Sequence, residues 1–397
     1  MTTSTPLALY GPDFAADPAG HYERLRVHGP VAPVELAPGV RALLVTDYQA
    51  ALDLLRDTHT FSKDPRGWQT TVPPDSPILP MLAYRPTALF SDGDVHARYR
   101  AAITDSLGLI EPHVLQRQVS TAAQRLIRDF SATGHADLMT QYARQLPLHV
   151  FNSWFGVPEE DSDRLVNGIA GMMNSAGNAA AAYADLVAVV TRLVADRRVR
   201  PRRDLISWFI AHPAGLENDE VIRQITLTMS AGHEPSTNLI GNALLHMLTD
   251  PRYAGSLYGG AMTAHEAINE VLWQDPPVAN FSAHYPRYDT VFHGRQLRAG
   301  ELVLVSYAAA NLQSRPPVGH DLPRSGDNAH LAWAAGPHGC PARQPALLIA
   351  ITAIEQLTSH LTDMELTCHP SELLWRPGPF HRALTHLPVR FSTLTGW

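Results

Sequence analysis

A chain of 397 residues, 45% of them hydrophobic, is long enough to bury a large core. Its formal net charge of −7 argues against general nucleic-acid binding, and its two cysteines cannot form a disulfide framework. No basic region followed by an apolar one stands at the N-terminus, and no run of 18 apolar residues occurs. We therefore expect a cytoplasmic protein without a signal peptide or a membrane anchor.

The predicted elements change character along the chain. Residues 30–50 predict strands, because short apolar runs alternate there with turn residues. Residues 65–90 are rich in proline and have little periodicity, which predicts a long loop. From about 94 to 270, apolar residues recur at spacings of three and four, which predicts helices. Strand character returns over 275–310, and a last helix is expected over 341–361.

The longest predicted helix covers residues 221–248, with apolar side chains along one face. At about 1.5 Å per residue, some 30 residues would extend for about 45 Å. Pro235 lies in its middle. A proline there removes its own N–H and frees the carbonyl of Ala231, four residues earlier. The proline either has only a structural role, as a kink in the helix, or has a functional role at this position.

Cys340 lies in a glycine-rich loop directly before the last predicted helix. Gly336 and Gly339 permit a tight turn that brings the backbone close to a large flat ligand, and Pro341 suits the first turn of a helix. A thiolate at a helix N-terminus gains from the dipole and the free N–H groups, which lower its pKa. These are conditions for a metal-ligating cysteine, and the alternative is an ordinary inert cysteine.

The order aromatic–x–x–Gly–x–His–x–Cys, from Trp333 to Cys340, resembles the haem-ligand loop of the cytochrome P450 family. The resemblance extends over nearly the whole chain. It implies a single cytochrome P450 domain over residues 1–397, mainly α-helical with small β-sheets. It also implies haem b as the cofactor, held between the 221–248 helix and the loop, with Cys340 as the axial thiolate ligand of the iron.

The same resemblance implies four basic contacts for the haem propionates. His96 and Arg100 form a His-x-x-x-Arg pattern, which places them one turn apart on a helix face. His338 precedes the cysteine by two residues, and His284 stands where the family often has an arginine. Taken singly, each histidine would more often be a surface residue or a satisfied core residue than a ligand contact.

The segment from Ala231 to Thr237 resembles the distal-helix motif Ala-Gly-x-Glu-Thr-Thr, whose acid and alcohol relay protons to oxygen. Pro235 stands at the alcohol position. The resemblance therefore implies Glu234, Pro235 and Ser236 as catalytic positions, with proton delivery rerouted through Glu234, Ser236 or water. Members of the family that lack the alcohol include enzymes that couple phenols or aromatic side chains of peptides.

The segment from Glu270 to Trp273 aligns with the family's Glu-x-x-Arg helix, with Trp273 at the arginine position. A subset of actinobacterial members shares this loss. The usual ion pair with Glu270 cannot form, so Trp273 is expected to make a loop contact instead, by packing and through its indole N–H.

Substrate contacts implied by the resemblance are Trp68, Met81, Leu82, Tyr84, Met172, Met173, Gly232, His233, Asn280, Phe281 and Phe380. We expect a haem-thiolate oxidase of secondary metabolism that uses dioxygen to couple aromatic side chains in a small molecule or short peptide. Hydroxylation of an apolar metabolite, aromatic nitration and haem binding without turnover are the alternatives. Electrons would come from a separate ferredoxin and ferredoxin reductase, because 397 residues leave no room for a further redox domain.

Overall fold

The computed structural model describes residues 6–173, 179–250, 263–314 and 327–393. Helices dominate it. They are α1 (Pro12–Ala16), α2 (Pro18–Leu25), α3 (Tyr48–Arg56), α4 (Arg66–Gln69), α5 (Leu79–Leu82), α6 (Gly93–Gly108), α7 (Pro112–Ser131), α8 (Gln145–Phe155), α9 (Glu159–Met173), α10 (Ala179–Val199), α11 (Leu205–Ala211), α12 (Asn218–Thr249), α15 (Ala264–Gln274), α16 (Tyr307–Ser314) and α17 (Arg343–His360).

The strands form small sheets, as predicted. They are β1 (Leu7–Ala8), β2 (Val31–Ala37), β3 (Val40–Val45), β4 (Phe61–Ser62), β5 (His135–Asp137), β6 (Asn280–Pro286), β7 (Thr290–Phe292), β8 (Arg295–Leu297), β9 (Val303–Ser306), β10 (Leu361–Leu366) and β11 (Pro388–Thr393). The largest sheet has the order β1-β2-β3-β9-β6-β4, a second the order β10-β11-β5, and β7 pairs with β8. Val303 of β9 lies opposite Leu43 of β3 in parallel register and opposite His284 of β6 in antiparallel register.

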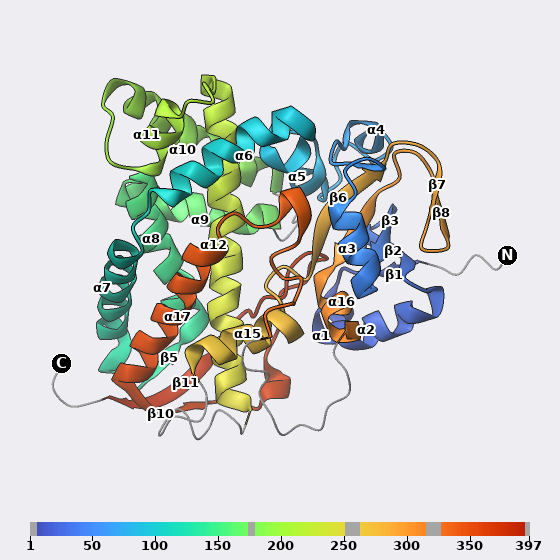
Figure 1. The fold of residues 1–397 in the computed structure, drawn as a ribbon. Coiled ribbons are helices and arrows are strands. Elements are labelled where there is room, and N and C mark those ends of the chain that lie inside the picture. Colours follow the sequence, from blue (N-terminus) through green and yellow to red (C-terminus); the bar gives the residue numbers. More distant parts are fainter. Residues whose placement is uncertain (1–5, 174–178, 251–262, 315–326, 394–397) are drawn as a thin grey trace.

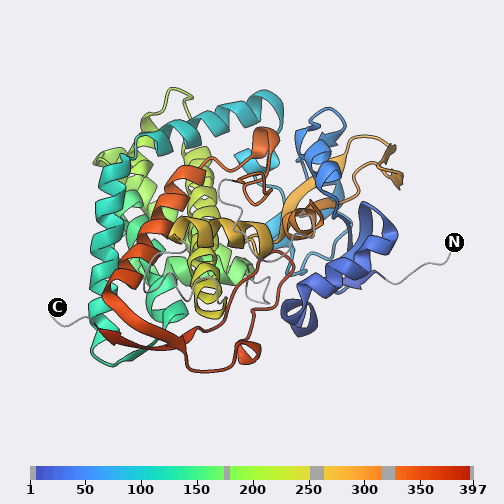
Figure 2. The ribbon, with the colours of Figure 1, turned by 60° about the horizontal axis from the view of Figure 1, so that its bottom comes forward.

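Helix α12 is the axis of the helical part (Figure 1). It packs against α8, α9, α10, α15 and α17, so it is buried along most of its length. The six-stranded sheet, covered by α3 and α16, lies to one side, and Figure 2 shows the same separation from below. None of the helices in the described ranges combines the length and apolar character that a membrane span needs.

The proline-rich stretch 65–90 differs from the predicted loop. It contains the one-turn helices α4 and α5 and a 3-10 turn over Ala88–Phe90. Long-range hydrogen bonds hold it in place: the Gln224 side chain of α12 accepts from the Ala88 N–H at 3.0 Å and donates to the Pro86 carbonyl at 3.0 Å. These bonds join residues far apart in the sequence, so local periodicity could not predict them.

The predicted 221–248 helix is confirmed and slightly longer, over Asn218–Thr249. Its 32 residues correspond to a length of about 48 Å. Glu220 anchors the N-terminal end, because its carboxylate accepts bonds from the Glu217 N–H, from Arg98 and from the Tyr99 hydroxyl. The helix continues through Pro235.

Candidate active site

The loop before α17 turns tightly and presents Cys340. The Cys340 N–H donates to the Trp333 carbonyl at 2.8 Å, and the Gly339 N–H donates to the Gly336 carbonyl at 3.0 Å. Gly336 has a φ of +68°, and a Cβ there would lie 2.2 Å from the Leu55 carbonyl oxygen of α3. Both the conformation and the close approach therefore require glycine.

Cys340 opens into a cavity of about 260 Å³, which we call the cysteine cavity. Its lining includes Arg100 and His338 on the side of Cys340. Pro235 and Ser236 of α12 lie in its wall. The predicted placement of a site between this helix and the cysteine loop is thus found in the structure. Cys368 is absent from the residues that line this cavity.

The environment of the Cys340 thiol differs from the prediction. Helix α17 begins at Arg343, so Pro341 precedes the helix instead of forming its first turn. Burial raises the pKa of the Cys340 thiol, and a hydrogen bond from the Ala342 N–H and the charges of Arg100 and Arg343 oppose this rise. The expected favourable groups are present, but desolvation outweighs them.

Basic side chains gather beside the cysteine. The rings of His96 and His338 lie 4.1 Å apart between centroids, and Arg100 donates to the Gly339 carbonyl. Burial and, to a smaller extent, the charges of Lys63, His96 and Arg100 together lower the pKa of His338 to about 2. The structure therefore brings His96, Arg100 and His338 together, as the resemblance implied.

His284 lies deeper, on β6. Its Nδ1 is 2.6 Å from the Ser282 carbonyl oxygen, and the side chain is buried. Burial, followed by the charge of Lys63, lowers its pKa well below the ordinary value. His284 is close enough to Lys63 and His338 to feel their charges, but it does not line the cysteine cavity.

Lys63 also belongs to this basic cluster, and no motif in the sequence predicted it. It is buried, its Nζ has no hydrogen-bond partner within the described part of the chain, and burial lowers its pKa to about 7. Asp92 fixes its position, because the carboxylate accepts from the Lys63 N–H and from the Ser62 hydroxyl. One signal could have identified it: Lys63 is the single lysine among 31 lysine and arginine residues.

The cluster is chemically suited to an anionic, iron-containing macrocycle. Buried polar atoms are normally paired, yet Lys63 Nζ and His96 Nε2 are both buried without partners. Carboxylates placed beside them would supply acceptors and charge, and the Cys340 thiol in the cysteine cavity would supply a soft metal ligand. These residues therefore fit haem: Lys63, His96, Arg100 and His338 would hold its propionates, and Cys340 would ligate its iron.

Of the three predicted catalytic residues on α12, two line the cysteine cavity and one does not. Pro235 and Ser236 line the cysteine cavity, and the Ser236 hydroxyl donates to the Gly232 carbonyl at 2.8 Å. Glu234 is buried away from this cavity, where Arg376 donates to its carboxylate. The carboxylate is therefore already neutralised by a cation.

His233 and Gly232 face helix α8. The His233 ring lies edge-on to Phe151, with 6.3 Å between centroids, and burial lowers its pKa to about 4. His233 is not among the residues that line the cysteine cavity. Gly232 does line the cysteine cavity, but a Cβ on it would lie 2.6 Å from the Phe151 ring. The two helices thus meet closely at this point.

A second cavity of about 170 Å³ adjoins the first, and we call it the arginine cavity after Arg85 and Arg223 in its wall. Of the predicted substrate contacts, Met81, Phe281 and Phe380 line it. Trp68, Leu82, Tyr84 and Asn280 line neither cavity. Met172 and Met173 belong to α9, but their side chains lie outside what the structure describes.

The residues outside the cavities have other partners. Trp68 packs against Tyr285, with 6.0 Å between ring centroids, and the guanidinium of Arg66 lies 4.6 Å from the Tyr84 ring centroid. Asn280 accepts from the Tyr22 hydroxyl at 3.1 Å and donates to the Pro379 carbonyl at 2.7 Å. The bond to Pro379 fixes the chain directly before Phe380.

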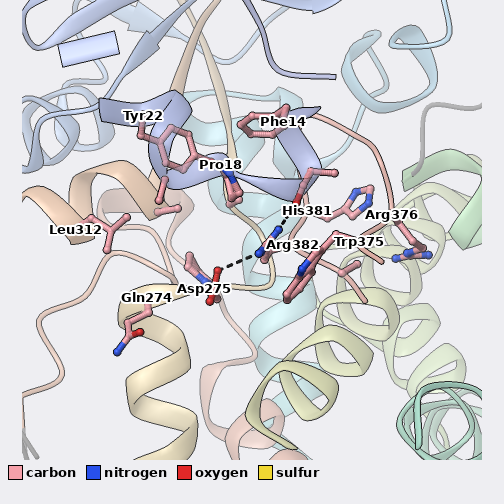
Figure 3. Close-up of a pocket in the computed structure, with 16 residues that line it drawn as sticks. Phe14, Pro18, Tyr22, Gln274, Asp275, Leu312, Trp375, Arg376, His381 and Arg382 are labelled. Carbon is pink, nitrogen blue, oxygen red and sulfur yellow. Dashed lines mark hydrogen bonds and ion pairs between the residues drawn. The ribbon is translucent and has the colours of Figure 1, made fainter. Parts of the chain in front are cut away.

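The segment that carries Phe380 is further fixed by Arg382, beside a small cavity of about 30 Å³ (Figure 3). Arg382 pairs with Asp275 at 3.1 Å, donates to the Ala15 carbonyl and stacks on Trp375 at 3.3 Å. Burial alone would raise the pKa of Asp275, but a hydrogen bond from His246 and the charge of Arg382 hold it below its ordinary value. Helices α1 and α15 are thereby joined to the wall of the arginine cavity.

Trp273 makes the loop contact that was predicted. Its indole N–H donates to the Asp327 carbonyl at 3.0 Å, and its ring lies edge-on to His330. Asn269, one turn earlier on α15, donates to the same carbonyl at 3.0 Å. The Glu270 carboxylate accepts a hydrogen bond from Gln274.

Comparison with known proteins decides the family. The chain is 30% identical over 404 residues to the cytochrome P450 monooxygenase PikC of Streptomyces venezuelae, covering 98% of this chain and 96% of that protein. The chain belongs to the cytochrome P450 family. No protein-family model matches this P450.

Two further similarities agree. The P450 is 28% identical over 396 residues to 2-hydroxy-5-methyl-1-naphthoate 7-hydroxylase of Streptomyces carzinostaticus, covering 95% of this chain and 96% of that enzyme. The solved structure of CYP154C4 from Streptomyces sp. W2061 superposes on this chain with a TM-score of 0.91 at 26% sequence identity. The match covers 99% of this chain and 100% of that one. The predicted P450 fold and the oxidoreductase class are confirmed.

Haem is accordingly the cofactor of this P450, held through a cysteine thiolate. Members of the family generally receive their electrons from separate redox partners, so the predicted kind of partner agrees with the family.

Proposed function

We propose that this P450 is an oxidase of secondary metabolism that joins two aromatic groups of a small molecule or short peptide. When bound, haem supplies the oxidising chemistry. In the overall reaction, one dioxygen takes up two electrons, two protons and two hydrogen atoms of the substrate, and it is reduced to two waters. Two bonds to hydrogen break in the substrate and one bond between the aromatic groups forms. No oxygen atom enters the product.

The observation that carries this proposal is the chemistry of α12 at the cysteine cavity. Pro235 has neither an alcohol nor an N–H, the Glu234 carboxylate is paired with Arg376, and the Ser236 hydroxyl donates into the helix. A proton delivered to oxygen here would come from water instead of these side chains. Removal of hydrogen atoms needs a strong oxidant but no controlled oxygen insertion. It can therefore proceed without a proton-donating side chain of α12 in the cavity wall.

The remaining residues have binding roles in the proposal. Cys340 would ligate the iron, and Lys63, His96, Arg100 and His338 would bind the propionates, with His284 as a further basic contact. Met81, Phe281 and Phe380 contact the substrate from the arginine cavity. Phe281 and Phe380 lie edge-on to each other, with 5.6 Å between centroids, which offers aromatic surface to an aromatic substrate. A ferredoxin and its reductase supply the electrons.

Hydroxylation is the second candidate, favoured by the similarity to an enzyme named as a naphthoate hydroxylase. Its balance differs, because one oxygen atom enters the product and the other leaves as water. Nitration would instead require a source of a nitro group, and haem binding without turnover would give no product.

Turnover in isotopically labelled dioxygen tests the proposal. With tripeptides such as Tyr-Ala-Trp, we expect a product two hydrogens lighter than the substrate and without label. A product that gains one labelled oxygen would reject coupling in favour of hydroxylation, and a nitrated product would reject both. The Cys340→Ser variant should lose the far-red-shifted Soret band of the reduced carbon monoxide complex, whereas Cys368→Ser, the matched control, should keep it.

A further inference from the structure

Two arginines line one end of the otherwise mainly apolar arginine cavity. Arg85 lies between α5 and the 3-10 turn, and Arg223 lies in the second turn of α12. None of the residues lining this cavity in the described part of the chain carries a carboxylate. Two cations thus face the same space without an acidic neighbour in its wall.

The two arginines are held differently. Arg85 donates to the Pro80 carbonyl, and its guanidinium lies 4.2 Å from the Tyr183 ring centroid. Burial, and further the charge of Arg223, lower the pKa of Arg85 below its ordinary value. Arg223 makes no hydrogen bond or ion pair with any residue that the structure describes. One cation is therefore positioned by its surroundings, and the other is available to a ligand.

Thr87 supplies a second, independent observation. Its side chain is 3% exposed and lines the same cavity, and its hydroxyl has no hydrogen-bond partner among the residues that the structure describes. Buried hydroxyls are normally paired, and an unpaired one is costly. The neighbouring hydroxyls of Thr226 and Ser230 already donate to carbonyls of α12 at 2.8 Å. Thr87 therefore offers a free donor beside two guanidinium groups.

The cavity places this polar end far from the cysteine. Arg223, Leu227, Ala231 and Pro235 line it at spacings of four residues, which puts them along one face of α12. The twelve residues from Arg223 to Pro235 correspond to about 18 Å along the helix. Leu227, Ala231 and Pro235 also line the cysteine cavity, so one elongated molecule can occupy both spaces.

We propose that the substrate of this P450 carries a carboxylate, which Arg223 and Arg85 bind at the far end of the arginine cavity with Thr87 as a further donor. Guanidinium groups bind carboxylates through paired, charge-assisted hydrogen bonds, and a ligand carboxylate would also offset the repulsion between the two cations. The inference rests on the proposed oxidase function and narrows its substrate to aromatic acids or peptides with a free C-terminus.

The test uses probes that are anchored to the iron of the holoenzyme. Imidazolyl-decanoic acid binds haem iron through its imidazole and carries its carboxylate at the far end of a ten-carbon chain. We expect it to bind about tenfold more tightly than its primary amide, measured by the Soret shift and by calorimetry. Arg223→Gln and Arg85→Gln should each reduce this preference, and the double variant should abolish it.

Two controls keep the result interpretable. Imidazolyl-acetic acid carries its carboxylate next to the imidazole, so its affinity should be the same in native and variant proteins if the cavities are intact. Arg41→Gln removes an exposed arginine on β3 and should leave the preference of the long probe unchanged. Equal binding of the long acid and its amide to the native protein would overturn the inference, as would a preference that survives in the double variant.

The source of the carboxylate is distinguished by paired substrates. Tyr-Ala-Trp with a free C-terminus is compared with its C-terminal amide, and an aromatic alkanoic acid is compared with its amide. A preference for the acid in one pair identifies that class of substrate, and no preference in either pair counts against the inference. Failure of coupling would appear separately, as a labelled oxygen in the product, and would leave the acid-over-amide preference measurable.

Discussion

The indole N–H of Trp273 donates to the main-chain carbonyl of Asp327 over 3.0 Å. This bond joins α15 to the chain that leads into the Cys340 loop. A neutral donor replaces the cation that the family pattern has at this position, and Asn269 supports it on the same carbonyl. The tie between helix and loop therefore depends on packing and two neutral hydrogen bonds.

Changing Trp273 should weaken this tie in a graded manner. Trp273→Phe keeps most of the ring but loses the donor, so we expect the free energy of unfolding to fall by about 1–2 kcal/mol. Trp273→Arg places a cation in a site shaped for an indole, and we expect a loss of about 2–4 kcal/mol. Urea unfolding of the holoenzyme measures both. Greater stability of Trp273→Arg with unchanged spectra would contradict the role of packing.

Lys63 should contribute to haem retention. Each charge-assisted bond is worth roughly 1.5–3 kcal/mol, so Lys63→Met should release haem at least about tenfold faster to apomyoglobin. Lys63→Arg keeps the charge and should retain haem better than the methionine variant. Equal release rates for native protein and Lys63→Met would remove Lys63 from the propionate contacts.

Because Lys63 is the single lysine, its accessibility can be followed chemically. Reductive methylation of the holoenzyme should leave its amine unmodified, whereas modification after haem removal should add methyl groups to this one side chain. Mass spectrometry of the peptide that contains Lys63 reads the result. Equal labelling in both forms would place the amine away from the haem.

His233 should make stability fall on acidification. Its pKa is lowered to about 4 in the folded chain and lies near about 6.5 when unfolded, so between these values the unfolded state binds the additional proton. The contribution of His233 to the free energy of unfolding is therefore fully present above about pH 6.5. It decreases toward pH 4, by up to about 3 kcal/mol. Arg144 and Arg376 face the ring and add to the cost of a charge there.

The measurement is the pH dependence of unfolding in native protein and His233→Gln. The free energy of unfolding of the native protein should fall relative to that of His233→Gln as the pH decreases from 6.5 to 4, because glutamine takes up no proton. Curves that stay parallel over this range would show that His233 is not held neutral.

Substitutions of Pro235 separate the hydroxyl from the backbone N–H. Pro235→Thr and Pro235→Ala both restore a helical N–H, but only threonine adds a hydroxyl. If coupling needs the shape of the proline ring in both cavities, both variants should give less product per NADPH, by a similar factor. A rise in product per NADPH confined to Pro235→Thr would instead indicate that the alcohol was the missing component.

The sequence patterns that proved reliable are those contained within one element. The period of apolar residues predicted α12, and the turn chemistry around Gly336 predicted the loop that presents Cys340. The spacing of His96 and Arg100 placed both on α6, beside the cysteine. Each of these inferences needed only local geometry.

Predictions that depended on tertiary partners were less complete. Nothing near Glu234 in the sequence indicates Arg376, and nothing near His233 indicates that Phe151 would face it. Lys63 lies 33 residues before His96, joined to it through the bonds of Asp92 to β4. Such contacts arise when distant segments pack, so periodicity and spacing carry no information on them.

The contact between Gly232 and Phe151 has a consequence for altering substrate range. A side chain at position 232 would collide with a ring of α8 before it reached the substrate, so libraries randomised at this codon would chiefly yield misfolded protein. Leu89 and Leu227 line both cavities and are partly exposed to them, so diversity introduced at these positions would reshape the space itself. Laboratory evolution of this enzyme should therefore accept changes on one wall of the cavity and reject them on the wall formed by α8.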